Sequence, residues 1–275
     1  MTYRFEQGRL YRMPTHFGPA PGPRQIPPEA NADPTRSPRK TMVAASFLTA
    51  RDALERHLPP GFALIGEPAV TVEFHYMTDI DWLAGRGYTM IHVWWPASFT
   101  GVRDRAEGRF LAVMWENLAD PIISGREEIG HPKLYADIPE LLIAKGAYRC
   151  AASWMGFKFL EVEVGSSCEA TSPSQESPRL FDGTLMLKYL PRTGAWGEAD
   201  VCQVTLTPTA NPDLTIERTE KSNGIVRFRS AKWADLPTMQ HVVNALAALP
   251  MLEPRGASVT WSRGGKPYLD QRVLE

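Results

Sequence analysis

The chain has 275 residues, of which 43% are hydrophobic, and a formal net charge of −1 from 30 basic and 31 acidic residues. Length and apolar content suffice for one substantial hydrophobic core. The balanced charge argues against a partner nucleic acid, because neutralising phosphates requires a basic surface. The three scattered cysteines, Cys150, Cys168 and Cys202, exclude a disulfide framework and a cysteine-based zinc site.

The sequence carries no sign of export or of a membrane anchor. Its first residues lack the apolar core of about 7 to 15 residues that a secretory signal needs, and no apolar run approaches the roughly 20 residues of a spanning helix. We therefore expect a cytoplasmic protein that does not bind a membrane.

Residues 1–40 are predicted to form a proline-rich N-terminal arm. Eight prolines lie between positions 13 and 40, with few large apolar side chains among them, so this segment has little core of its own. Two interpretations stay open, a strap that packs across a neighbouring subunit and a mobile leader. Residues 41–275 are predicted to form a single domain.

The domain opens with a short predicted helix and a strand. Thr49 is placed to cap a helix that ends before Pro59 and Pro60. In the strand at 70–76, valines and aromatic residues alternate with Thr71, Glu73 and His75. Such alternation predicts one face that packs in the core and another that is able to line a polar cavity.

The rest of the chain is predicted to consist mainly of strands. Residues rich in β-branched and aromatic side chains favour strands at 88–95, 110–116, 148–164, 184–190, 201–207, 225–230 and 257–262. Asp235 is placed to cap a helix containing Val242 and Leu246, and residues 166–178 are predicted to be a loop. We expect an α+β fold, mostly antiparallel β, with few short helices and a curved or barrel-like sheet enclosing a central cavity.

The segment at 125–134, GREEIGHPKL, contains the most informative residue, Lys133. Pro132 restricts the backbone before this lysine, and Gly125 and Gly130 permit unusual backbone angles, so the segment is predicted to be a rigid turn that presents one amine. Only a neutral amine attacks a carbonyl, so burial or nearby positive charge must lower the lysine pKa. Without wider context, a solvated turn lysine is the simpler interpretation.

That context comes from a family resemblance over residues 42–262. The chain resembles the acetoacetate decarboxylase family in its GREE-IG-HPKL segment, and further motifs recur in family order at 110–115, 154–158, 185–191, 213–215 and 234–237. The resemblance implies that Lys133 forms a Schiff base with a small keto acid. The resulting imine is an electron sink that allows a neighbouring bond to break or form.

The resemblance also exposes departures from the family pattern. Leu134 stands where the family has a second lysine, Leu48 where it has an arginine implicated in holding the substrate carboxylate, and Met90 near its second pocket glutamate. Glu73 matches the first pocket glutamate and is predicted to be the acid or base. These departures imply slow or absent carbon dioxide release from acetoacetate, and they are similar to the pattern of aldolase-dehydratases of the superfamily. Decarboxylase chemistry stays open.

Further polar residues are candidates for the substrate pocket. Arg126 and Glu128 flank the lysine segment, and His75 shares a strand face with Glu73. Arg126 is predicted to pair with Glu127 and brace the turn, and Glu128 is a second candidate proton carrier. For each of these residues, a structural role is the competing interpretation.

No cofactor is expected. The chain has no glycine-rich phosphate loop or dinucleotide fingerprint, and its six histidines form no zinc motif, so we expect no metal. The expected partners are a small keto-acid substrate and further copies of the chain in a homo-oligomer. The alternative function is a non-catalytic small-molecule binding protein that retains the cavity of this fold.

Overall fold

The computed structural model describes residues 4–165 and 181–275. Within them, an 11-stranded sheet has the strand order β12-β14-β1-β3-β4-β5-β10-β11-β15, with β2 beside β4 and β6 beside β5. Its strands are β1 (Arg39–Leu48), β2 (Phe62–Leu64), β3 (Ala69–Ile80), β4 (Arg86–Thr100), β5 (Arg105–Glu116), β6 (Lys133–Tyr135), β10 (Gly183–Pro191), β11 (Ala199–Pro208), β12 (Thr215–Ser222), β14 (Glu253–Arg263) and β15 (Arg272–Leu274).

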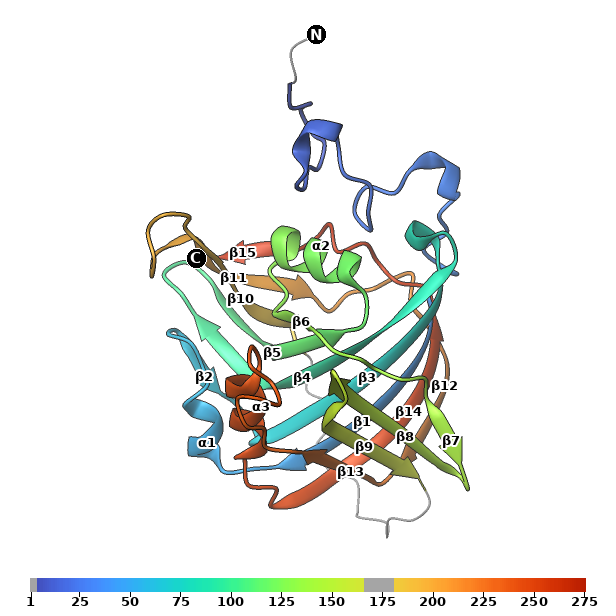
Figure 1. Cartoon of the computed structure of the whole chain (residues 1–275), viewed down its shortest axis with the longest axis vertical. Coiled ribbons are helices and arrows are strands. Elements are labelled where there is room, and N and C mark those ends of the chain that lie inside the picture. Colours follow the sequence, from blue (N-terminus) through green and yellow to red (C-terminus); the bar gives the residue numbers. More distant parts are fainter. Residues whose placement is uncertain (1–3, 166–180) are drawn as a thin grey trace.

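A smaller, 4-stranded sheet lies across one face of the large one (Figure 1). Its strands, in the order β13-β9-β8-β7, are β7 (Leu142–Ala144), β8 (Ala147–Trp154), β9 (Phe157–Gly165) and β13 (Gly224–Phe228). The helices are α1 (Arg51–Glu55), α2 (Ala119–Ile129) and α3 (Gln240–Ala247), and short 3-10 helices occur at Thr15–Phe17, Pro28–Ala30 and Asp81–Leu83.

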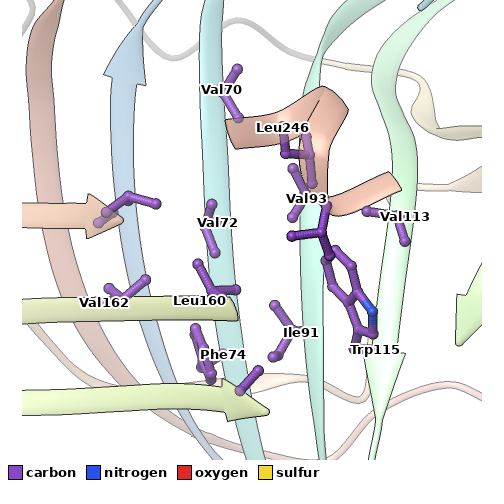
Figure 2. Packing of buried hydrophobic residues seen from close by; sticks show 14 of the residues in the cluster. Val70, Val72, Phe74, Ile91, Val93, Val113, Trp115, Leu160, Val162 and Leu246 are labelled. Carbon is purple, nitrogen blue, oxygen red and sulfur yellow. The ribbon is translucent and has the colours of Figure 1, made fainter. Parts of the chain in front are cut away.

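The two faces of the central strands have different roles because side chains alternate along a strand. On β3, Val70, Val72 and Phe74 are fully buried in the main core. They pack with apolar residues of β4, β5, β9 and α3, as Figure 2 shows. The intervening residues Glu73 and His75 therefore face away from this core, on the side of the sheet where α2 lies.

The predicted fold class is confirmed: the protein is α+β, with mostly antiparallel strands and few helices. The large sheet is curved (Figure 1), but it is not a closed barrel, because β12 and β15 end the order of its described strands. The predicted strand at 148–164 is a hairpin, β8–β9, whose strands end and begin on either side of Met155 and Gly156, both with positive φ.

Both predicted helix caps are wrong. Helix α1 begins after Ala50, and the buried hydroxyl of Thr49 has no hydrogen-bond partner among the described residues. Helix α3 begins after Met239, while the Asp235 carboxylate accepts a hydrogen bond from the backbone N–H of Lys232. Both helices begin later than the cap motifs predict, and only Asp235 makes a local hydrogen bond before its helix starts.

The predicted loop at 166–178, which includes Cys168, lies outside the described residues. In the part of the chain that is described, no helix combines the length and the apolar character that crossing a membrane requires.

Candidate active site

A mostly apolar cavity of about 290 Å³ lies between the large sheet, helix α2 and the N-terminal arm. Lys133 lines it. Its lining also includes Arg24, Lys40, Met90, His92, Met114, Pro121, Gly125 and His131. A larger, open and polar hollow around Asp33 and Arg263 does not include Lys133.

Lys133 reaches this cavity through the way helix α2 ends. Gly130 has φ 75° and closes the helix, and the N–H of His131 donates to the carbonyl of Gly125 at 3.0 Å. The carbonyl of Pro132 then accepts from Met114 at 2.9 Å, so that β6 joins β5 in parallel. The predicted rigid turn is thus a helix end followed by a strand, and Gly125 is inside the helix.

The main chain around the lysine is held by two basic side chains. Arg126 donates to the carbonyl oxygen of Lys133 at 2.8 Å. Lys188 donates to the carbonyl of Glu127 at 2.7 Å, a favourable position for a cation at a helix C-terminus. The predicted brace therefore exists, but Arg126 bonds to backbone instead of to Glu127, and its exposed side chain is not part of the cavity lining.

The amine of Lys133 is buried against a carboxylate. Its side chain is 7% exposed, and Nζ lies 2.8 Å from Oε1 of Glu116, a fully buried residue, and donates to the carbonyl of Pro121 at 2.9 Å. Burial lowers the pKa of Lys133 and raises the pKa of Glu116, although each partner's charge opposes the shift of the other. Both shifts favour the neutral forms, an amine beside a carboxylic acid.

Glu73 contacts a different set of groups. Its Oε2 lies 3.1 Å from Nε2 of His75 and 3.6 Å from Nδ1 of His92, while Oε1 lies 3.8 Å from Arg109. Burial alone would raise the pKa of Glu73, but hydrogen bonds from the two histidines and the charge of Arg109 hold it well below its usual value. The predicted role of Glu73 as acid or base stays a prediction, since the carboxylate beside the amine is Glu116.

The remaining predicted pocket residues divide between the cavity and other places. Met90 lines the cavity, whereas Leu48 ends β1 and pairs with Ala69 of β3. The carboxylate of Glu128 forms ion pairs with Arg12 and Arg24 of the arm. The structure thus gives Glu128 a role in holding the arm.

Sequence reasoning missed several charged residues of the site, including Arg24 of the arm, Lys40 and Glu116. Lys40 belongs to β1, directly opposite Met77 of β3, but the proline pattern places it at the end of the arm. Glu116 is the last residue of the apolar strand β5, on the same face as Met114. The available signal was the alternation of the strands: Lys40 is two residues from Met42 on β1, and Glu116 is two residues from Met114 on β5, so each charge shares a strand face with a methionine.

The family profile of acetoacetate decarboxylase (ADC) matches residues 12–262. No curated protein matches the chain.

Several solved structures share the fold. One described as acetoacetate decarboxylase has a TM-score of 0.66 at 20% identity and covers 86% of this chain and 87% of its own. The acetoacetate decarboxylase from Legionella pneumophila has a TM-score of 0.65 at 21% identity, covering 89% of this chain and 88% of its own. The enduracididine biosynthesis enzyme MppR, complexed with pyruvate, has a TM-score of 0.60 at 19% identity, covering 86% of this chain and 89% of its own.

At these low sequence identities, the solved structures show that the fold is shared. Family membership is shown by the family profile, which matches nearly the whole chain. The chain belongs to the acetoacetate decarboxylase family.

Proposed function

We propose that this protein is a cofactor-independent lyase that forms a Schiff base between Lys133 and a small keto acid. Membership in the family supports an enzyme of the lyase type. The single observation that carries the proposal is the buried amine of Lys133, which lines the cavity and whose pKa burial lowers. A lowered pKa increases the neutral fraction, the form that attacks a ketone.

Glu116 would move the protons of this reaction. When the amine attacks the ketone carbon, the nitrogen must lose a proton and the carbonyl oxygen must gain two before it leaves as water. A carboxyl group at 2.8 Å from the nitrogen, with its pKa raised by burial, is placed to accept and return these protons. The protonated imine then withdraws electrons from the adjacent bond.

Lys40 is the candidate partner for the substrate carboxylate. It lines the cavity, and no hydrogen bond or ion pair of its amine is found within the described residues. Burial lowers the pKa of Lys40 and the charge of Glu73 opposes this shift; a substrate carboxylate would likewise favour the charged amine, so the cavity suits an acid as the ligand. The cavity volume of about 290 Å³ is at the small end of ligand pockets and fits a small keto acid.

Aldolase-dehydratase-type and decarboxylase-type reactions both follow from such an imine. The related fold of MppR has been solved with pyruvate and with the condensation product of pyruvate and imidazole 4-carboxaldehyde, which supports pyruvate as the first trial substrate. Carbon dioxide release from acetoacetate separates the two reaction types, and we expect slow or absent release.

Borohydride reduction in the presence of pyruvate, acetoacetate or a longer oxo acid tests the proposal. Intact mass measurement should then show one reduced keto acid added per chain. If none of these acids adds to the protein, the imine mechanism is wrong.

The ion pair between Lys133 and Glu116 favours one alternative function, a non-catalytic protein that binds a small anion. The charge of Glu116 raises the pKa of Lys133, and if this effect dominated, the lysine would stay charged and the protein would bind an anion without reacting. Lys133→Ala separates the two functions, because an enzyme would lose turnover by orders of magnitude, whereas a binding protein would lose only ligand affinity.

A further inference from the structure

A second cluster of reactive side chains lies on the same face of the sheet as the cavity. Glu73 and His75 are two residues apart on β3, and His92 is directly opposite Glu73 on β4. Because alternate residues of a strand share a face and cross-strand partners are neighbours, this pattern brings all three side chains together. One ligand atom from each lies within 4.8 Å of the other two.

We propose that Glu73, His75 and His92 form a binding site for a transition-metal dication of the zinc type. A set of two imidazole nitrogens and one carboxylate oxygen suits zinc or cobalt and does not suit calcium or magnesium, which prefer oxygen ligands. This site is separate from the chemistry proposed for Lys133.

The distances between the donor atoms match such an ion. Zinc bonds of about 2.0–2.1 Å at tetrahedral angles place neighbouring donors roughly 3.4 Å apart. Both histidine nitrogens approach the same oxygen of Glu73, Oε2, at 3.1 Å for His75 and 3.6 Å for His92. A small ion between these three atoms requires little movement of the side chains.

Arg109 contacts the carboxylate of Glu73 from outside the cluster, and His92 connects the cluster to the cavity. The other oxygen of Glu73, Oε1, lies 3.8 Å from Arg109, whose guanidinium stacks 4.7 Å from the ring centroid of Trp94. Arg109 can therefore orient the carboxylate without competing for the oxygen that faces the histidines. His92 also lines the cavity, so an ion held by it borders the cavity.

The second ring nitrogen of each histidine, and the nearby cations, also bear on the site. Within the described residues, Nδ1 of His75 and Nε2 of His92 are buried without a hydrogen-bond partner. These are not the nitrogens that approach Glu73, so an ion held by Nε2 of His75 and Nδ1 of His92 leaves them unchanged, and the case for the site rests on the donor geometry. The positive charges of Lys40 and Arg109 nearby oppose a cation, and titrations should therefore extend to weak affinities.

Titration with Co²⁺ tests the site. The full chain, purified without a histidine tag and stripped with EDTA, should bind one Co²⁺ with the intense visible absorption of a four-coordinate ion, and Zn²⁺ should displace it. Glu73→Gln and His92→Asn should each weaken binding at least ~10-fold. His57→Asn, an exposed histidine far along the chain from the site, is the matched control and should bind as the wild type does.

Lys133→Ala should bind Co²⁺ unchanged, which separates this proposal from that of the Schiff base. Circular dichroism and melting temperature verify that each variant is folded; if Glu73→Gln fails to fold, the half-buried His92 decides the result. Absence of the visible bands in the wild type, or equal affinities of the wild type, Glu73→Gln and His92→Asn, would show that the trio is a hydrogen-bonded network only.

Discussion

Gly125 lies directly against the amine of Lys133. A Cβ atom at position 125 would be 2.5 Å from Nζ and 2.5 Å from Cε of the lysine. Glycine inside a helix costs roughly 0.5–1 kcal/mol relative to alanine, so helix α2 gives up stability at this position. Because Gly125 has no side chain, the side chain of Lys133 can pass close to the backbone of α2 and reach Glu116.

Gly125→Ala should therefore impair the site more than the fold. The new methyl group must displace the amine, and a misplacement of about 1 Å can lower a rate ~100-fold. We expect a loss of that order in borohydride-trapped imine, with a melting temperature close to that of the wild type. Ile123→Ala, an exposed position on the same helix, is the control. Wild-type trapping by Gly125→Ala would mean that the amine reacts from another position.

Glu116→Gln should separate the two effects of the carboxylate. The charge of Glu116 raises the pKa of Lys133, so its removal lowers that pKa further and the neutral amine is reached at lower pH. At the same time, the amide cannot carry protons, and the maximal rate should fall by ~100-fold or more. The pH dependence of imine trapping measures both. A rise in the apparent pKa, or an unchanged maximal rate, would contradict the role given to Glu116.

Lys40→Met should weaken the binding of a keto acid. A hydrogen bond to a charged group contributes about 1.5–3 kcal/mol, which corresponds to a rise of ~10- to 100-fold in KM or Kd. Lys40→Arg should restore part of the affinity, and Lys221→Met, on the exposed strand β12, should have no effect. Equal KM values for Lys40→Met and the wild type would place the carboxylate elsewhere.

His75 should make the protein less stable in mild acid. Its burial lowers its pKa from 6.5 to about 3, so between these values the unfolded state binds one more proton than the folded state. The free energy of unfolding then falls as the pH drops below 6.5, by up to ~1.4 kcal/mol per pH unit. Urea unfolding in EDTA between pH 7 and pH 5, above the titration of Glu73, should show a steeper fall for the wild type than for His75→Gln. Parallel slopes would contradict this origin.

The two ion pairs of Glu128 should hold the N-terminal arm over the cavity. Pro23, Arg24 and Ile26 of the arm line the cavity, and Glu128 binds both Arg12 and Arg24. Glu128→Gln should make residues 13–40 several-fold more sensitive to proteolysis, whereas the neighbouring Glu127→Gln should not. Equal cleavage of the two variants would favour the view that the arm is held by other contacts, such as those with a neighbouring subunit.

Period-two alternation made the sheet predictable. On β3, the alternating buried valines and polar residues fix which side chains face the core, and the structure confirms both faces. The same pattern could not reveal the hairpin within 148–164, because only Met155 and Gly156 separate its two strands.

The candidate site was less predictable because its charged residues come from four separate elements. Lys133 was found through its local motif and through the family pattern. Glu116 and Lys40 lie at the end of one strand and the start of another, where a charge is ordinary, and only the pairing of strands brings them to the cavity. The cluster of Glu73, His75 and His92 likewise depends on the register between β3 and β4.

Peptide mapping after borohydride reduction with pyruvate tests the central claim, that the buried amine of Lys133 forms the imine. The account predicts the added mass on the peptide that contains Lys133, and no addition in Lys133→Ala. An adduct located on any other lysine, or an equal adduct in Lys133→Ala, would contradict it.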